Sequence, residues 1–222
     1  MTDHNHISNS NKKFEYGSRS LPHMFNSEKP VFITYRLKFS VPQPVLEELE
    51  RRKQNFLQQA PQSSITEKQN YLRTKNTRYF AWFDDLIANC QGSPQILARD
   101  DVSAILSSAF HYHDGIRYKL ICYCIMPSHV HVLISPMKQE DGEIFSLQHI
   151  IYTWKRFTAI RINQLLQSTG SLWMKESYDR VVRDDIEMGH VIEYILLNPV
   201  KAKLVKDWED WPGSFLCKEC LH

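Results

Sequence analysis

The feature that most constrains the fold is a pair of apolar segments separated by only two residues. Tyr118–Met126 reads YKLICYCIM and is almost continuously apolar, Pro127 and Ser128 interrupt it, and His129–Ile134 reads HVHVLI. Two β-branched and aromatic segments joined in this way are typical of an antiparallel hairpin. The chain therefore has to build part of its core around an antiparallel sheet.

The segments on either side of this hairpin alternate between extended and helical patterns. The segment Val31–Phe39 predicts a first strand, and a further short strand is expected at Arg180–Arg183. Apolar residues spaced by three and four predict helices over about Lys68–Asn89, Ser146–Gln167 and Ile186–Leu197. A charged helix is expected at about Val45–Gln59, and a capped helix at Val102–His113. Helices interleaved with antiparallel strands predict an α+β sandwich, with the helices on one face of the sheet.

The length of 222 residues favours one domain with additions. We expect that domain to cover residues 30–215, with a flexible polar arm at 1–29, a helical insertion at about 45–97 and a tail at 216–222. Apolar residues make up 42% and charged residues 23%, which excludes disorder as the main state. No stretch approaches the roughly 18 apolar residues of a membrane span, and the N-terminus lacks the apolar core of a secretory signal. A cytoplasmic protein that does not act at a membrane is therefore expected.

The cysteine pattern is typical of a reducing compartment. The count is odd, and the alternating pair in the apolar strand is expected to be buried, so free thiols are expected at Cys90, Cys122, Cys124, Cys217 and Cys220. The C-terminal CKECLH, with His222, resembles half of a zinc knuckle. Because no second CxxC completes it, a plain surface tail is favoured over a structural zinc.

Two histidines in the second strand of the hairpin form the first candidate site. Residues i and i+2 of a strand point to the same face, so His129 and His131 present two neighbouring imidazoles. Such a pair can ligate one divalent metal. The alternative is a pair of half-exposed surface histidines. His111 and His113 have the same spacing, but they fall at the end of a predicted helix, where their directions diverge.

The last predicted helix carries a second candidate site. Its core face consists of Met188, Val191, Ile192, Ile195 and Leu196. Tyr194 and Asn198 lie one turn apart on a polar stripe beside that face. Asn198 could offer a carbonyl oxygen to a metal, and a tyrosine beside a metal and histidines can act as a nucleophile toward phosphorus. The pattern alone favours the alternative, a tyrosine at the boundary of an amphipathic helix.

The charge distribution bears on nucleic-acid binding. The net charge of +2 for the whole chain does not by itself indicate it. From Ile151 to Lys206, however, the chain contains nine Lys or Arg residues and six Asp or Glu residues, a local net charge of +3. Tryptophans are interleaved with these cations. This combination suits phosphate contacts and base stacking on single strands. The alternative is a solvated charged face above core tryptophans.

A family pattern runs through the chain. It consists, in order, of MPSHVHVLI, WKRFTAIRIN, LWMKESYDRVVRDD, VIEYILLNPVKAKLV and DWEDWPGSF. Together these motifs resemble the single-tyrosine HUH transposases, and most closely the REP-associated tyrosine transposases, which are related to the transposases of IS200/IS605-type elements. The resemblance extends from about Pro30 to Phe215 and includes FITYRLKFSVP and RYFAWFDDLI.

The resemblance implies a ferredoxin-like or RRM-like core and a defined reaction. A tyrosine cleaves single-stranded DNA, keeps the 5′-phosphate as a phosphotyrosine and releases a 3′-hydroxyl. By position, Tyr194 would be the nucleophile, and His129, His131 and Asn198 would hold Mg²⁺ or Mn²⁺. Tyr178 is a rival nucleophile by residue type, but the tyrosine of the family precedes xxxNP, as Tyr194 does.

The resemblance also implies a partner, single-stranded DNA with imperfect hairpins. The expected phosphate contacts, chosen by charge and location, are Lys155, Arg156, Arg180 and Arg183. Relatives occur as monomers and as homodimers, and both states stay open. Two alternative functions also stay open: a domesticated hairpin-binding protein with little or no turnover, and a metal-dependent phosphoesterase that acts on another substrate.

Two residues depart from the usual family motifs. Ser128 stands where the family commonly has asparagine, and Lys203 stands where it commonly has glycine. Neither change is expected to touch a proposed ligand or the nucleophile.

Overall fold

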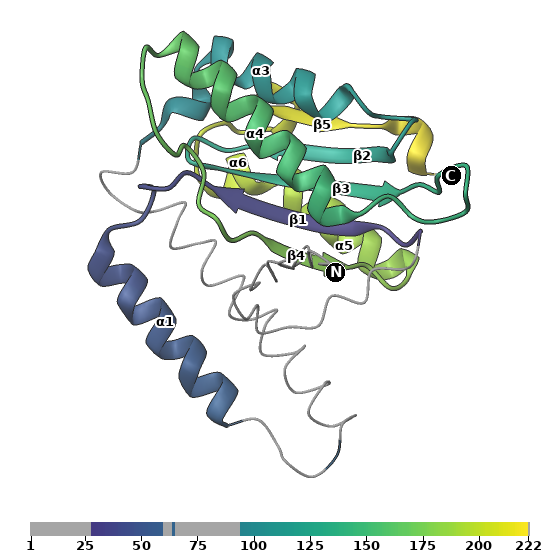
Figure 1. Ribbon diagram of the computed structural model, residues 1–222, viewed down its shortest axis with the longest axis horizontal. Coiled ribbons are helices and arrows are strands. Elements are labelled where there is room, and N and C mark those ends of the chain that lie inside the picture. Colours follow the sequence, from purple (N-terminus) through teal and green to yellow (C-terminus); the bar gives the residue numbers. More distant parts are fainter. Residues whose placement is uncertain (1–27, 60–63, 65–93, 222) are drawn as a thin grey trace, which may run out of the picture.

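A five-stranded sheet forms the centre of the computed structural model, which describes residues 28–59, 64 and 94–221 (Figure 1). The described elements are β1 (Val31–Arg36), α1 (Gln43–Gln58), η1 (Ile96–Ala98), α3 (Asp100–His111), β2 (Tyr118–Ile125), β3 (His129–Pro136), α4 (Leu147–Leu165), β4 (Tyr178–Val181), α5 (Asp185–Leu196), α6 (Asn198–Lys201), η2 (Trp208–Asp210), β5 (Ser214–Leu216) and η3 (Lys218–Leu221). The strands and helices expected in this part of the chain are present, with ends that shift by a few residues. The helix expected at Lys68–Asn89 and the arm up to residue 27 lie outside the described residues.

The strands follow the order β4-β1-β3-β2-β5, and every pair of neighbours is antiparallel. In the chain, β1-α3-β2-β3-α4-β4 has the βαββαβ connectivity of a ferredoxin-like fold. The expected hairpin is β2 paired with β3, with a shift of register between Leu120 and Cys122. The predicted α+β class with an antiparallel sheet is therefore confirmed.

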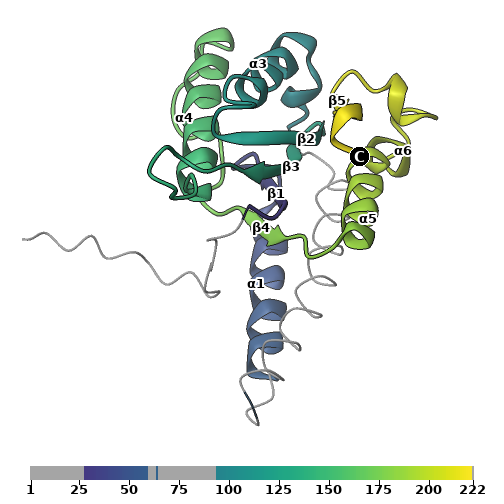
Figure 2. The same cartoon turned by 90° about the vertical axis from the view of Figure 1, so that its right-hand side faces the viewer.

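Helices cover both faces of this sheet (Figure 2). α3 and α4 pack on one face, where Phe110 and Trp154 join Val132 in one apolar cluster. α5 packs on the other face, where Ile195 joins Leu133 in a second cluster. The expectation of helices on one face thus holds for α3 and α4 and is corrected for α5. The physical reason is that the central strands are apolar on both faces, so both need a cover.

Side-chain caps define where the helices on the two faces begin. The hydroxyl of Ser146 accepts a hydrogen bond from the backbone N–H of His149, as expected for the cap of α4. The carboxylate of Asp184 accepts one from the backbone N–H of Glu187 at 2.8 Å and caps α5. α5 ends at Leu196, close to a proline that cannot donate to a continuing helix.

The C-terminal residues continue the sheet instead of forming a plain surface tail. β5 pairs with β2, and the backbone N–H of Cys217 donates to the carbonyl oxygen of Ile121 at 2.9 Å. Cys217 and Cys220 form a disulfide, and Cys220 is buried. The expectations of free thiols and of a plain surface tail are therefore wrong at these two residues. Cys122 and Cys124 are buried thiols as expected, and Cys90 and the last residue lie outside the described part.

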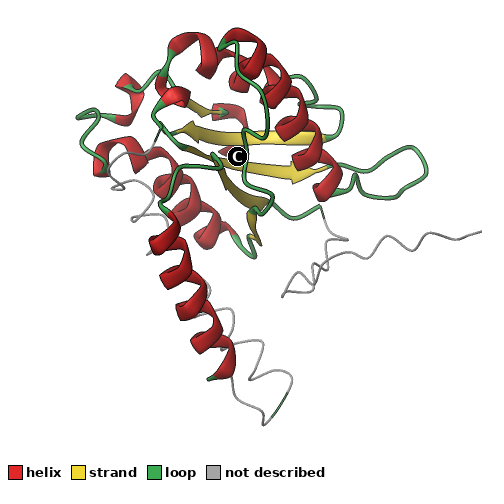
Figure 3. Cartoon of the chain, turned by 60° about the vertical axis from the view of Figure 1, so that its left-hand side comes forward, coloured by secondary structure: helices red, strands yellow, loops and turns green. Residues whose placement is uncertain are grey.

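α1 opens the expected helical insertion and extends away from the sheet (Figure 3). Glu48 pairs with Arg51 and Arg52 along its exposed surface. In the described part of the chain, no helix combines the length and the apolar content that a bilayer span requires.

Candidate active site

His129 and His131 lie side by side on β3, and both are fully buried. Each has 0% of its surface exposed, and their ring centroids are 4.8 Å apart. Strand alternation turns them toward the α5 side of the sheet, while Val130 and Val132 join the cluster under α3 and α4. The two imidazoles are therefore neighbours, as their spacing predicted, and the alternative of half-exposed surface histidines is wrong.

A hydroxyl group lies at the Nδ1 atom of each imidazole. Thr34 sits opposite His131 across the β1–β3 pair, and its Oγ1 is 2.7 Å from Nδ1 of His131. The Oγ of Ser128 is 3.3 Å from Nδ1 of His129, so the expectation that this residue touches no proposed ligand is wrong. Sequence reasoning missed Thr34 because it lies 97 residues from its partner.

Tyr194 on α5 brings its ring to the histidine pair. The centroids of the Tyr194 and His131 rings are 5.8 Å apart, with the ring planes at 74°. The ring of Phe32 in β1 contacts both, with its centroid 6.0 Å from that of Tyr194 and 5.8 Å from that of His131. The ammonium of Lys201 lies 4.8 Å from the centroid of the Tyr194 ring, within the range of a cation–π interaction. The tertiary structure thus joins a tyrosine, a cation and two imidazoles.

Asn198 is the first residue of α6 and is buried. Its side-chain nitrogen donates to the main-chain carbonyl oxygen of Tyr194 at 2.8 Å. With the nitrogen used in this way, the amide oxygen is the atom of this side chain that can bind a cation. The residue lies one turn beyond Tyr194, as the helical spacing predicted.

Tyr178, the rival nucleophile, belongs to the same face of the sheet. It lies on β4 opposite Thr34, and its ring contacts Phe32 at 6.2 Å. Burial raises the pKa of Tyr178 to about 12, and the charge of Arg180 offsets this only in part. A phenolate is therefore harder to form at Tyr178 than at an ordinary tyrosine.

Lys155, an expected phosphate contact, has a structural role in this fold. Its ammonium donates to the carbonyl oxygens of Met174, Lys175 and Glu176 at 3.0, 3.3 and 3.1 Å. It also lies 5.2 Å from the centroid of the Tyr35 ring. The lysine thereby ties α4 to the segment that leads into β4.

Arg180 and Arg183 are held by one carboxylate. Glu187 accepts from Arg180 at 2.6 Å and from Arg183 at 2.9 Å. Burial alone would raise the pKa of Glu187, but hydrogen bonds from Arg183 and the charges of both arginines hold it below its ordinary value. The two arginines expected to contact phosphates are therefore held together by Glu187, where β4 leads into α5.

Comparison with known proteins identifies relatives in two bacteria, although no protein-family model matches the chain. A protein of Haemophilus influenzae named as a REP-associated tyrosine transposase is 24% identical over 117 residues, which are 50% of this chain and 64% of that protein. A REP-associated tyrosine transposase of Escherichia coli is 24% identical over 99 residues, 44% of this chain and 53% of that protein. The chain thus spans less than two thirds of the length of either relative.

A solved structure of a REP-associated tyrosine transposase bound to a REP hairpin has a similar fold. The TM-score is 0.52 at 15% identity, over 88% of this chain and 81% of that chain. The chain is similar in sequence to two REP-associated tyrosine transposases, and it shares the fold of the solved structure. The resemblance expected from the motifs is confirmed.

A divalent cation at His129 and His131 stays a prediction, and the side chains present can be compared with the ligands that such an ion needs. Among residues 28–59, 64 and 94–221, no group of three or more His, Cys, Asp or Glu side chains could hold a metal. A third ligand from this part of the chain would therefore be of another type, such as the amide oxygen of Asn198. Two imidazoles and one amide oxygen fit Mn²⁺ better than Mg²⁺, because Mg²⁺ prefers oxygen ligands.

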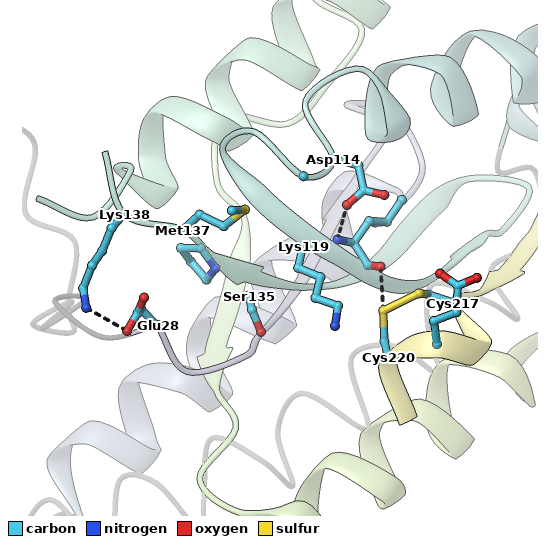
Figure 4. A pocket seen from close by; sticks show the side chains of 12 residues that line it. Glu28, Asp114, Lys119, Ser135, Met137, Lys138, Cys217 and Cys220 are labelled. Carbon is cyan, nitrogen blue, oxygen red and sulfur yellow. Dashed lines mark hydrogen bonds and ion pairs between the residues drawn. A yellow bond between two sulfur atoms is a disulfide. The ribbon is translucent and has the colours of Figure 1, made fainter. Parts of the chain in front are cut away.

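Two cavities lie away from the histidine pair. One, of about 660 Å³, lies between the end of β3 and the C-terminal disulfide, with Glu28 paired to Lys138 at its rim (Figure 4). Its lining carries both signs of charge and none of the expected site residues. The other, of about 490 Å³, runs along α4, and we call it the α4 groove. Its lining includes Tyr152, Arg156 and Lys175, all exposed, so a basic and aromatic surface borders the core.

Proposed function

We propose that this chain is a metal-dependent single-stranded DNA endonuclease and strand transferase that cleaves beside hairpins. The observation that carries the proposal is the contact between the rings of Tyr194 and His131 on one face of the sheet. A phenol placed beside two imidazoles that suit a divalent cation has the groups needed to attack a phosphodiester. The relatives named as transposases support the same chemistry.

In the proposed reaction, the phenolic oxygen of Tyr194 attacks the phosphorus of a DNA phosphodiester. As the phenol loses its proton to solvent, an O–P bond forms to the 5′-phosphate and the bond from phosphorus to the 3′-oxygen breaks. The 3′-oxygen then takes up a proton from solvent as a 3′-hydroxyl. A bound divalent cation would stabilise the negative charge on the scissile phosphate. The ammonium of Lys201 places a further positive charge beside the attacking ring. Attack of another 3′-hydroxyl on the phosphotyrosine then joins new ends without an external energy source.

The proposed substrate is single-stranded DNA that carries an imperfect hairpin. In the α4 groove, Arg156 and Lys175 can contact phosphates, and Tyr152 can stack on a base. Arg180 and Arg183, oriented by Glu187, form a second basic site near β4. We assign Lys155 to the wall of the groove instead of to the DNA, because its ammonium already binds backbone carbonyls.

The test uses hairpin-bearing oligonucleotides from palindromic repeats that flank the gene, labelled at the 3′ end and mixed with Mn²⁺ or Mg²⁺. A covalent adduct appears as labelled protein on a denaturing gel. We expect the wild-type protein and Tyr178→Phe to form the adduct. Tyr194→Phe should bind the same hairpins and form none. Tyr178→Phe is the matched control, because it removes a second tyrosine hydroxyl from the same face of the sheet.

Two outcomes would contradict parts of this proposal. An adduct that persists in Tyr194→Phe and disappears in Tyr178→Phe would make Tyr178 the nucleophile. A wild-type protein that binds the hairpins but forms no adduct with either metal would be a hairpin-binding protein without turnover.

A further inference from the structure

The hydroxyls of Thr34 and Ser128 bear on which nitrogen of each histidine can bind a metal. An imidazole that ligates through Nε2 carries its proton on Nδ1, and that N–H needs an acceptor. A hydroxyl oxygen can accept this hydrogen bond while its own proton turns elsewhere. A hydroxyl that accepts from Nδ1–H therefore stabilises the tautomer in which Nε2 is available to a metal.

We propose that Thr34 and Ser128 are positioning residues that keep His131 and His129 protonated on Nδ1 and so present Nε2 as the ligating nitrogen. Each hydroxyl oxygen lies within hydrogen-bond distance of the corresponding Nδ1, at 2.7 and 3.3 Å. Only 3% of either residue is exposed, so bulk water does not compete for these nitrogens. The metal in this inference rests on the proposed function, but the tautomer is a property of the metal-free protein.

The surroundings of His131 make Thr34 the stronger of the two contacts. Thr34 is directly opposite His131 in the β1–β3 register, and its branched side chain has few rotamers. Phe32, two residues earlier on the same face, stacks on the His131 ring with an interplanar angle of 22°. The stack limits the tilt of the imidazole, and the hydroxyl limits its rotation. The contact from Ser128 is longer, so we expect a smaller effect there.

The experiment reads the tautomer of each imidazole by long-range ¹H–¹⁵N NMR of metal-free protein, about two pH units above the ordinary histidine pKa of roughly 6.5. We expect the proton on Nδ1 in the wild type, a shift toward Nε2–H for His131 in Thr34→Val, and recovery in Thr34→Ser. The affinity for Mn²⁺, measured by calorimetry, should fall by about 10–100-fold in Thr34→Val and recover in Thr34→Ser. Ser128→Ala should shift the tautomer of His129 toward Nε2–H in the same way.

The matched control is Thr158→Val. Thr158 is as buried as Thr34, but its hydroxyl donates to the carbonyl oxygen of Trp154 and accepts from the indole N–H of Trp173, on the other side of the sheet. This variant loses a buried hydroxyl and should leave both the tautomers and the Mn²⁺ affinity unchanged. A general loss of stability is thereby separated from a loss of positioning.

The outcomes separate this inference from the proposed function. A wild-type His131 with its proton on Nε2 overturns the inference even if Thr34→Val does not fold. An unchanged tautomer and unchanged Mn²⁺ affinity in Thr34→Val also overturn it. If the tautomer shifts in Thr34→Val but the wild type binds no Mn²⁺, the positioning by Thr34 stands and the metal of the proposed function fails.

Discussion

The side-chain nitrogen of Asn198 donates a hydrogen bond to the main-chain carbonyl oxygen of Tyr194, 2.8 Å away. The bond satisfies a carbonyl near the end of α5 and orients the amide of Asn198 at the same time. The proposed nucleophile and the proposed third ligand are thus coupled through the backbone.

Substitution of Asn198 should separate these two roles. Asn198→Ala removes the donor and the amide oxygen, so we expect a loss of about 1 kcal/mol in the free energy of unfolding and a weaker affinity for Mn²⁺. Asn198→Asp also loses the donor, but it offers a charged oxygen, so it should be similarly destabilised and bind Mn²⁺ at least as well as the wild type. Urea unfolding and calorimetry measure the two quantities. An Asn198→Ala protein with wild-type affinity would exclude this residue as a ligand.

The backbone conformation at Lys203 explains why glycine is common at this position of the family motif. It has a φ of +58°, in the left-handed region that favours glycine. Its N–H donates to the carbonyl of Val200, and the N–H of Leu204 donates to that of Pro199, which together form a Schellman motif after α6.

Lys203→Gly should therefore stabilise the protein. Relief of about 1–2 kcal/mol of left-handed strain exceeds the roughly 0.4–1 kcal/mol gained in unfolded-state entropy, which leaves a net gain of about 0.5–1 kcal/mol. Thermal unfolding measures it. The control is Lys206→Gly, an exposed site without a positive φ, where glycine should cost stability. Equal losses in the two variants would refute the strain argument.

Lys155 should matter for stability more than for DNA affinity. Lys155→Met keeps the aliphatic stem and removes the ammonium from three backbone carbonyls, so we expect a loss of about 1–3 kcal/mol in the free energy of unfolding. Arg156→Gln, the neighbouring control at an exposed position, should leave stability unchanged and weaken hairpin binding. It should also reduce the slope of log binding constant against log salt concentration by about one. Urea unfolding and binding at several salt concentrations check both. A Lys155→Met protein of normal stability would contradict the structural role.

Glu187 should make part of the stability depend on pH. Its pKa in the folded protein lies below the ordinary value of 4.5, so its stabilising contribution is complete above that pH and is lost as the pH falls through the folded pKa. Glu187→Gln should lower the free energy of unfolding by about 1–3 kcal/mol at neutral pH, and this difference should shrink in acid.

Urea unfolding of both proteins at neutral and acid pH tests this dependence. Glu193→Gln, an exposed change on the same helix, is the control and should have little effect at either pH. A Glu187→Gln deficit that stays constant into acid would show that the carboxylate charge is not its cause.

The sequence could predict features that depend on near neighbours in the chain. The alternation of HVH places His129 and His131 on one side of β3 wherever that strand lies. The 3.6-residue period likewise separates Tyr194 and Asn198 by one helical turn. Ser146 is recognisable as a cap from its position before an apolar period. These features depend on local backbone geometry, which a few consecutive residues determine.

Only the tertiary structure decided which distant groups meet. Local patterns show the face on which Thr34 lies, but not that β1 pairs with β3 in the register that brings it to His131. They show that Lys155 and Arg180 are charged, but not that backbone carbonyls and Glu187 engage them. The physical reason is that the pairing of strands and the burial of charges are set by the packing of the whole core, to which residues far apart in the chain contribute together.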